Sequence, residues 1–291
     1  MKFNNPILKG YADPDVLYYD GVYYLYATSY NINDGYEVFS STDLVNWKNH
    51  GNCLAHKPWG LDKDFWAPDV KEHNGKFYML ASVSVHLGLC VADSPLGPFV
   101  PMDGFLFKGT IDGHIFFDGD DMYIYYVTWQ KGYKYGIWGC KMKPDYITPD
   151  MSTEKALIHP TDPYETHMNP VTEAPYIMKK DGQYFLTYSG CNFKSPYYCV
   201  AYAQSDSPLG EYVKYENNPI LVGDGVTVSG IGHHCITTMP NGKDYAIIYH
   251  IHHKPNDFSR RDLCVGNIRF EEKDGKTVLV CDKHQTQIQY I

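Results

Sequence analysis

The sequence predicts an all-β fold, a five-bladed β-propeller with four antiparallel strands in each blade. The first observation behind this prediction is a turn followed by an aromatic strand, which recurs at residues 20–25, 74–79, 118–124, 181–186 and 241–246. These turns contain Asp-Gly or Asn-Gly, the pairs that suit the positive φ angles of type I′ hairpins. The units lie roughly 45 to 63 residues apart, which leaves room for about four short strands in each.

A second recurring element supports the same repeat. A Ser- and Asp-containing turn followed by an aromatic residue occurs at residues 41–47, 92–99 and 205–212, and it fits the corner before the outer strand of a blade. The third observation is a lack of convincing helical periodicity, because Pro and Gly interrupt the chain every few residues. A β-sandwich is the second choice, since its turns would recur every ~8–12 residues without the longer period.

The composition is that of one globular domain. Hydrophobic residues make up 44% of the 291 residues, which is near the globular average. All-β domains often reach this length as a single unit, so we expect residues 1–291 to form one catalytic propeller domain. The 27 Tyr, 13 Phe and 5 Trp suit half-buried strands, and exposed aromatic rings can also stack on sugars.

The charge of the chain and its first residues limit the binding partners and the cellular location that we expect. The formal net charge is −9 and no basic stripe interrupts it, which argues against nucleic acid or an anionic membrane as a partner. Residues 1–6 lack an apolar segment of the kind found in signal peptides, so we expect a cytoplasmic protein. The eight cysteines are scattered without a Cys-x-x-Cys pair, which disfavours zinc and favours buried thiols, with a disulfide or two left open.

Polar residues are expected around the central channel of the propeller. Counting back from each turn, the innermost strands open with Asp13, Asp69, Asp112, Glu173 and His233. Innermost strands line the channel, so several carboxyls would share one small space, and their mutual repulsion raises at least one pKa. Such an arrangement persists mainly where it serves chemistry, and convergent carboxyls are what glycosidic-bond hydrolysis needs.

With these residues in place, the sequence resembles glycoside hydrolase family 43 over nearly its whole length. The segments that carry the resemblance are Asn5-Pro6-Ile7-Leu8 with Ala12-Asp13-Pro14-Asp15, Trp66-Ala67-Pro68-Asp69-Val70, Ile111-Asp112, Thr172-Glu173-Ala174-Pro175 and Gly230-Ile231-Gly232-His233. No single segment is specific. Their order around a fivefold repeat makes the joint signal strong.

The resemblance implies an inverting glycoside hydrolase whose active site lies in the axial funnel. Asp13 would be the general base, Glu173 the general acid, and Asp112 the residue that orients Glu173 and raises its pKa. An inverting reaction needs about 6.5–9.5 Å between the base and the acid, so that a water fits. The chain departs from the family at Ala174-Pro175 and Asp112-Gly113, which alters the pocket walls and leaves the carboxyls in place.

Other residues have two readings each. Trp66 either packs in the core or forms a platform under the sugar. Arg261 resembles the family arginine that binds sugar hydroxyls, with Arg260 as the register alternative and a surface ion pair as the plain reading. His233 is a structural residue or, as the resemblance implies, a ligand of a structural calcium held through waters in the channel. The chemistry itself requires no cofactor.

Two further polar features have plainer interpretations. Asp69 is expected to bond backbone groups rather than to take part in the chemistry. His250, His252 and His253 could form a pocket wall, a strand surface or a zinc site.

The substrate follows from the resemblance, because family members cleave α-L-arabinofuranosides and β-D-xylosides. We expect an exo-acting α-L-arabinofuranosidase that trims side chains of arabinoxylan and arabino-oligosaccharides, with a β-D-xylosidase as the alternative. A non-catalytic carbohydrate-binding propeller is the rival from another class, and a retaining fructoside hydrolase is a third reading. The oligomeric state is open.

Overall fold

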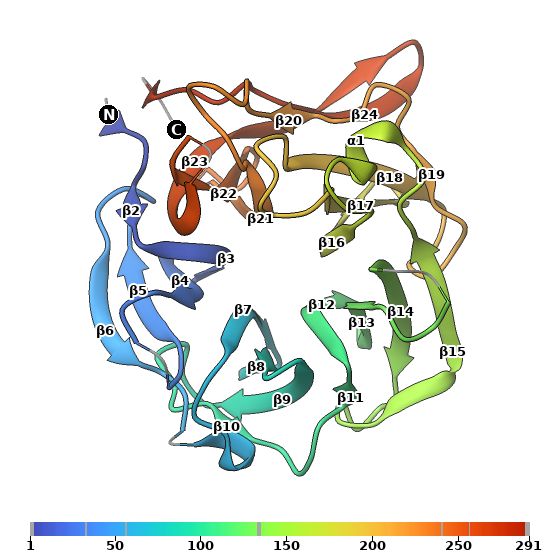
Figure 1. The fold of residues 1–291 in the computed structure, drawn as a ribbon. Coiled ribbons are helices and arrows are strands. Elements are labelled where there is room, and N and C mark those ends of the chain that lie inside the picture. The colour runs from blue at the N-terminus through green and yellow to red at the C-terminus, as the bar shows by residue number, and fades with distance from the viewer. Residues whose placement is uncertain are drawn as a thin grey trace.

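The computed structural model describes residues 3–32, 34–55, 57–132, 135–239, 241–255 and 257–288. Five antiparallel sheets stand around a central axis, as the sequence predicts, and Figure 1 views them along that axis. Helical structure is limited, among these residues, to the 3₁₀ turn η1 (Pro58–Gly60) and the short helix α1 (Pro163–Thr166). None of the described helices is long and apolar enough to cross a membrane.

Each blade runs outward from the axis in chain order. Blade 1 contains β3 (Tyr11–Tyr19), β4 (Val22–Ser29), β5 (Glu37–Ser41) and β6 (Lys48–Asn52). Blade 2 contains β7 (Phe65–His73), β8 (Lys76–Val83) and β9 (His86–Ala92), which pairs with both β10 (Val100–Pro101) and β11 (Phe107–Lys108). Blade 3 contains β12 (Thr110–Asp118), β13 (Asp121–Thr128), β14 (Gly136–Met142) and β15 (Pro149–Ile158).

The last two blades follow the same plan. Blade 4 contains β16 (Thr172–Lys180), β17 (Gln183–Gly190) and β18 (Cys199–Ser205), which pairs with both β19 (Val213–Lys214) and β20 (Leu221–Val222). Blade 5 contains β21 (Gly232–Thr238), β22 (Tyr245–Lys254), β23 (Asp257–Lys273), β24 (Lys276–Cys281) and β2 (Leu8–Lys9). The remaining strands, β1 (Phe3–Asn4) and β25 (Gln287–Ile288), pair with each other.

The ring closes because the first residues of the chain join the last blade. Strand β2 pairs with β23, where Leu8 lies opposite Leu263. The Asn5 amide adds a side-chain clasp, because its Nδ2 donates to the Val265 carbonyl at 2.9 Å and its Oδ1 accepts the Val265 amide at 3.0 Å. Strand β2 comes from the N-terminal end of the chain and joins the sheet of blade 5, so the backbone itself links blade 5 to blade 1.

Every innermost strand carries a β-bulge at the same point. The pairing register shifts there, and the bulged residue has a positive φ: 52° at Asp13, 39° at Ala67, 55° at Asp112, 53° at Ala174 and 42° at His233. A bulge re-aims the neighbouring side chains and is common beside active sites. The backbone therefore repeats five times around the axis even where the residue type differs.

The bulges correct two of the equivalences expected from the sequence. Ala67, not Asp69, is the counterpart of Asp13 in blade 2, and Ala174, not Glu173, is its counterpart in blade 4. Asp69 lies two residues beyond its bulge, and Glu173 lies one residue before its own. Exact counting back from the turns would have revealed the offset, because Asp13, Ala67 and Ala174 each lie seven residues before the first residue of their turn, Asp20, Asn74 and Asp181.

Hydrogen bonds from blade to blade fix the bulges. The amides of Ala67, Asp112 and His233 donate to the hydroxyls of Thr28, Ser82 and Ser189 in the preceding blades, at 2.8, 3.0 and 2.8 Å. At the junction of blades 3 and 4 the equivalent partner is Val127, which has no hydroxyl, and the Ala174 amide donates to Asp112 Oδ2 at 3.3 Å instead.

A second tier of bonds lies three residues further along the strands. Asp15 accepts the Val70 amide at 2.8 Å, and Asp69 accepts the Ile115 amide at the same distance. Asp69 thus bonds backbone, as expected. These bonds satisfy buried donors and lock adjacent blades in register.

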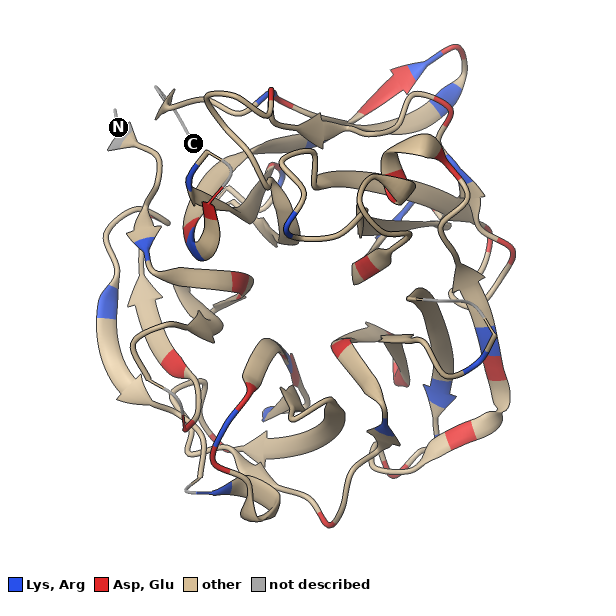
Figure 2. Cartoon of the chain, viewed as in Figure 1, with Lys and Arg blue, Asp and Glu red and all other residues tan. Residues whose placement is uncertain are grey.

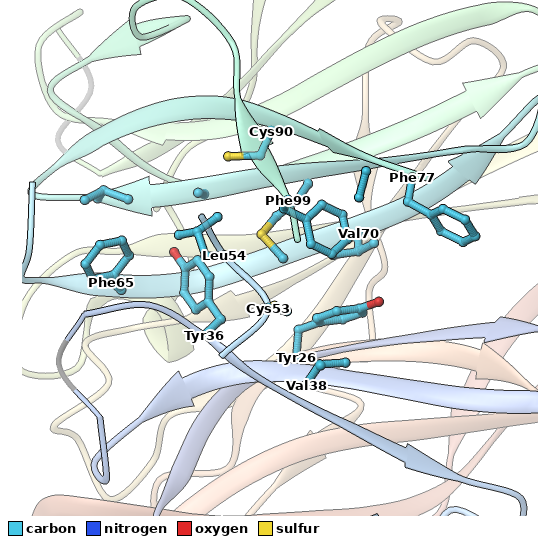
Figure 3. Packing of buried hydrophobic residues seen from close by; sticks show 14 residues of the cluster. Tyr26, Tyr36, Val38, Cys53, Leu54, Phe65, Val70, Phe77, Cys90 and Phe99 are labelled. Carbon is cyan, nitrogen blue, oxygen red and sulfur yellow. The ribbon is translucent and has the colours of Figure 1, made fainter. Parts of the chain in front are cut away.

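Apolar side chains fill the space between blades. Figure 3 shows the cluster between blades 1 and 2, in which the rings of Tyr36 and Phe65 meet edge to face at 5.7 Å and 89°. The Tyr36 hydroxyl donates to the Trp66 carbonyl at 3.0 Å, so a fully buried tyrosine keeps its polar group bonded. This use of tyrosine accounts for much of the aromatic content. All eight cysteines are free, and seven of them are buried.

Ser82→Ala tests whether the bulge bonds stabilise the fold. The change leaves the buried amide of Asp112 without its acceptor, so we expect the protein to lose about 1–3 kcal/mol of unfolding free energy in urea denaturation. Ser152→Ala, at an exposed position, is the matched control and should stay within about 0.5 kcal/mol of the unaltered protein. Equal stabilities of the two variants would contradict this role of the bond.

Candidate active site

A cavity of about 390 Å³ opens where the innermost strands begin. Its walls include three carboxyls from three blades, those of Asp13, Asp112 and Glu173, together with Arg261 and His233. Figure 2 shows acidic residues at the inner ends of β3, β12 and β16, facing the central opening. Strands far apart in the sequence thus bring the predicted residues to one place.

Asp13 is held in its ionised form. Its Oδ1 lies 2.6 Å from Arg261 Nη1 and 3.3 Å from His233 Nδ1, while the Thr28 hydroxyl donates to Oδ2 at 2.8 Å. Burial by itself would raise the pKa of Asp13, but the charges of Arg261 and His233 outweigh burial and hold that pKa well below its usual range. An ionised carboxylate with a free lone pair can accept a proton from water.

Glu173 has the opposite protonation behaviour. Burial is the largest cause that raises its pKa, to about 7, and the negative charge of Asp13 raises it further. The Tyr198 hydroxyl donates to Glu173 Oε1 at 2.7 Å and lowers the pKa in part. A carboxyl with a pKa near 7 stays protonated in mildly acidic solution and can donate its proton there.

Asp112 interacts with both Asp13 and Glu173. Burial raises its pKa to about 7, opposed by His233 and reinforced by the charges of Glu173 and Asp13. Its Oδ2 accepts the amide of Ala174, the residue that follows Glu173, at 3.3 Å. Asp112 is therefore connected to the backbone that carries Glu173, which suits an orienting role. Its influence on the pKa of Glu173 stays a prediction.

The predicted binding residues also line the cavity. Arg261 is buried and its Nε donates to the Tyr30 hydroxyl at 2.8 Å, whereas Arg260 is exposed. His233 Nδ1 lies between Asp13 and Asp112 Oδ2, 3.9 Å from the latter. Trp66 is half-buried and presents part of its side chain to the cavity, and its role as a platform for a sugar ring stays a prediction.

Sequence reasoning missed Tyr198, and it named His250 only as part of a possible pocket wall, strand surface or zinc site. The imidazole of His250 is fully buried, lies 3.2 Å from Asp13 Oδ1 through Nδ1, and stacks on Tyr198 at 5.7 Å and 15°. Burial lowers its pKa to about 3, so it is neutral. It thereby connects the surroundings of Asp13 to those of Glu173. Tyr198 lies in the loop just before β18 and His250 lies within β22, so their contact with each other and with the carboxyls is visible only in the fold.

The histidines near His250 have separate partners. His252 Nε2 lies 2.9 Å from the Phe193 carbonyl, and His253 Nδ1 lies 2.8 Å from Asp262 Oδ2. Within the described ranges, no three His, Cys, Asp or Glu side chains are grouped to hold a metal ion.

The channel beneath the cavity has few free oxygen atoms that could coordinate a cation directly. A space of about 20 Å³ lies there beside Asp15, Asp69 and His233. The ammonium of Lys71 already donates to Asp69 at 2.8 Å and to Asp15 at 3.0 Å. The side chains present therefore do not fit a directly coordinated calcium. Binding through waters at His233 stays a prediction, and the chemistry below uses no metal.

Comparisons with known proteins agree with the geometry. Residues 3–276 match the family described as Glycosyl hydrolases family 43. A curated relative, a Beta-D-galactofuranosidase of Aspergillus niger, is 29% identical, and the match covers 93% of this chain and 83% of the relative. A Xylosidase/arabinosidase of Butyrivibrio fibrisolvens is 28% identical, over 84% of this chain and half of that protein.

A solved structure extends the likeness to three dimensions. A thermostable family-43 glycoside hydrolase superposes with a TM-score of 0.88 at 32% identity, over 99% of this chain and 98% of that one.

The protonation states predict the pH dependence of kcat/KM on a glycoside. We expect kcat/KM to fall as the pH rises through about 7, because only protonated Glu173 can donate its proton. Since the pKa of Asp13 lies well below its usual range, no matching loss should appear on the acidic side above about pH 4. Initial rates at low substrate concentration measure this profile.

Tyr198→Phe sharpens the test. It removes a hydrogen bond that lowers the pKa of Glu173, so the alkaline fall in kcat/KM should move to higher pH. Tyr188→Phe is the matched control, because Tyr188 also donates to a buried glutamate, Glu165, at 2.7 Å but outside the cavity. A shift to lower pH in Tyr198→Phe, or the same shift in both variants, would contradict the assignment.

Proposed function

The chain belongs to family 43 of the glycosyl hydrolases, and we propose that it is an inverting exo-glycosidase that removes α-L-arabinofuranosyl side chains from arabinoxylan and arabino-oligosaccharides. The observation that carries this proposal is the pair of carboxyls in one cavity whose pKa values are moved in opposite directions. The pKa of Asp13 lies well below its usual range, and the pKa of Glu173 is about 7.

The reaction then takes one displacement step. Asp13 accepts a proton from a water molecule as that water attacks the anomeric carbon, and Glu173 donates its proton to the departing glycosidic oxygen. The bond from the anomeric carbon to the leaving oxygen breaks as the bond to the water oxygen forms, which inverts the anomeric configuration. Arg261 neutralises Asp13 in the resting state and offers donors to sugar hydroxyls.

Exo-cleavage is supported by the shape of the site. The carboxyls line a cavity of about 390 Å³, and beneath it the channel narrows to a space of about 20 Å³ beside Ala67, Gly113 and Pro175. Such a dead-ended cavity accepts the last sugar of a chain or a branch more readily than a sugar within a continuous backbone.

The choice of an arabinofuranosyl group has two supports. Val85, Ile111 and Val171 give the cavity apolar walls, which suit a pentose, because a pentose lacks the sixth carbon and its hydroxyl that a hexose carries. One relative is a galactofuranosidase and another is a xylosidase/arabinosidase, so a five-membered-ring sugar and arabinose both occur in the names of their activities. A β-D-xylosidase is the alternative, because xylose is also a pentose and lacks the sixth carbon of a hexose.

A panel of nitrophenyl glycosides tests the substrate. We expect the highest kcat/KM on the α-L-arabinofuranoside, then on the β-D-xyloside, then on the β-D-galactofuranoside, because a small apolar cavity favours the smallest furanoside. A higher kcat/KM on the xyloside would establish the alternative. No turnover of any of the three, together with measurable sugar binding, would favour a carbohydrate-binding propeller.

Leaving-group dependence tests the two carboxyl roles. Glu173→Gln should lower kcat about 10²–10⁴-fold on the methyl glycoside, whose leaving group needs a proton, and far less on the dinitrophenyl glycoside, whose leaving group does not. Asp13→Asn should lower kcat on both substrates, because both need an activated water. Equal losses in Glu173→Gln on the two substrates would contradict its role as the acid.

A further inference from the structure

A histidine supports the bulge that carries Asp13. The Asp13 amide donates to Nδ1 of His250 at 3.3 Å, from blade 1 to blade 5. His250 pairs with Gly232, the residue immediately before the bulge of blade 5. In blades 1, 2 and 4 the equivalent positions hold residues whose hydroxyls accept the amides of other bulges, namely Thr28, Ser82 and Ser189. Blade 5 therefore uses an imidazole where three other blades use a hydroxyl.

The bond to Asp13 determines which nitrogen of His250 carries the proton. Nδ1 accepts an amide hydrogen, so the proton of the neutral ring is on Nε2. Nε2 is buried and has no hydrogen-bond partner among the described residues. A buried donor without an acceptor destabilises the folded state, and a serine hydroxyl would support the bulge without that cost. Support of the bulge therefore does not by itself account for a histidine at this position.

The ring of His250 makes a second contact, with Tyr198. The two rings stack with 5.7 Å between their centres and 15° between their planes. Tyr198 also lies against Gly232, where an added Cβ atom would come within 2.2 Å of the tyrosine ring. Gly232 and His250 thus enclose the ring whose hydroxyl donates to Glu173 at 2.7 Å. A serine in place of the histidine would offer no ring to Tyr198.

We propose that His250 is a positioning residue that fixes Asp13 and Glu173 relative to each other. It acts on Asp13 directly through the amide, and on Glu173 through the ring of Tyr198. The inference rests on the proposed function, in which these carboxyls are the base and the acid. An inverting reaction needs the two carboxyls at a separation that admits one water, and a misplacement of about 1 Å can cost about 10²-fold in rate. One fully buried ring shared by both supports keeps that separation.

His250 acts by position and not by its own charge. The groups that face it are Asp13 on β3, His233 on β21, Arg261 on β23 and Tyr198 in the loop before β18. Burial is the largest cause that lowers the pKa of His250, to about 3, and the charge of Arg261 lowers it further. The ring therefore stays neutral where the enzyme works. A changed pH profile in a His250 variant reports on its neighbours.

Two substitutions separate the two contacts of His250. His250→Phe keeps a ring against Tyr198 but offers no acceptor to the Asp13 amide, whereas His250→Asn keeps an acceptor near the place of Nδ1 but has no ring. We expect His250→Phe to lower kcat on dinitrophenyl α-L-arabinofuranoside about 10²-fold with KM little changed. This leaving group needs no proton, so the rate depends on the activation of water by Asp13. His250→Asn should recover kcat to within about tenfold of the unaltered protein.

His250→Asn should instead change the protonation of Glu173. Without the stacked ring, the Tyr198 hydroxyl is no longer held against Glu173, and the pKa of Glu173 rises because that hydrogen bond lowers it. The carbon-13 titration of the Glu173 carboxyl should therefore move to higher pH in His250→Asn and stay in place in His250→Phe. The opposite pattern, or the same pattern in both variants, would overturn the proposal.

His114→Phe is the matched control for the loss of a buried histidine. His114 Nε2 accepts the Ile177 amide of the next blade at 3.1 Å, and the ring of His114 lies 4.5 Å from that of Tyr176. His114 does not line the catalytic cavity. This variant should lower stability in urea but leave kcat on the dinitrophenyl glycoside and the titration of Glu173 unchanged. A loss of kcat equal to that in His250→Phe would show a structural effect only and would overturn the proposal.

Nitrogen-15 NMR of labelled histidine separates failure of this inference from failure of the proposed function. We expect the His250 signals, assigned with His250→Asn, to show a proton on Nε2 and none on Nδ1 at neutral pH. If the protein hydrolyses no glycoside, the proposed function fails, and this tautomer together with the Glu173 titration still decides whether His250 holds both carboxyls. A proton on Nδ1 would overturn the inference even if the hydrolase activity is present.

Discussion

The positive-φ bulge in each innermost strand is the constraint on which the site depends. Non-glycine residues rarely adopt this conformation, which costs of order 1 kcal/mol or more and persists only where the surroundings enforce it. Here the preceding blade enforces it, because the hydroxyls of Thr28, Ser82 and Ser189 accept the amides of three of the five bulges. The positive φ occurs at five equivalent positions. The packing of each blade against the next therefore also sets the direction of the catalytic side chains.

That cause also explains why the carboxyls differ in role. Asp13 and Asp112 occupy bulge positions, whereas Glu173 precedes its bulge by one residue and so approaches the cavity from a different point of the backbone. The difference places Asp13 against Arg261 and places Glu173 against a tyrosine hydroxyl. Burial raises the pKa of both groups, and at Asp13 the nearby charges of Arg261 and His233 outweigh burial. One repeated backbone thereby yields an ionised carboxylate and a protonated one.

The sequence was sufficient to predict the five blades, because hairpin turns and aromatic strands are local signals. It also predicted the residues that meet in the cavity, since their order around the repeat matched a known family. The bulge register predicted for blades 2 and 4 was wrong, because Asp69 and Glu173 were matched to Asp13 by residue type, although Ala67 and Ala174 lie at the same distance from their turns as Asp13 does. Tyr198 was missed, and the neighbour of His250 was not predicted, because their roles arise from contacts between segments that are distant in sequence.

One cavity keeps Asp13 ionised and Glu173 protonated in the resting enzyme. Carbon-13 NMR of labelled aspartate and glutamate carboxyls, assigned with Asp13→Asn and Glu173→Gln, measures both titrations without turnover. We expect the Glu173 carboxyl to titrate near pH 7 and the Asp13 carboxyl to remain ionised well below the usual aspartate range. A Glu173 carboxyl that ionises with the ordinary glutamate pKa of about 4.3 would contradict it.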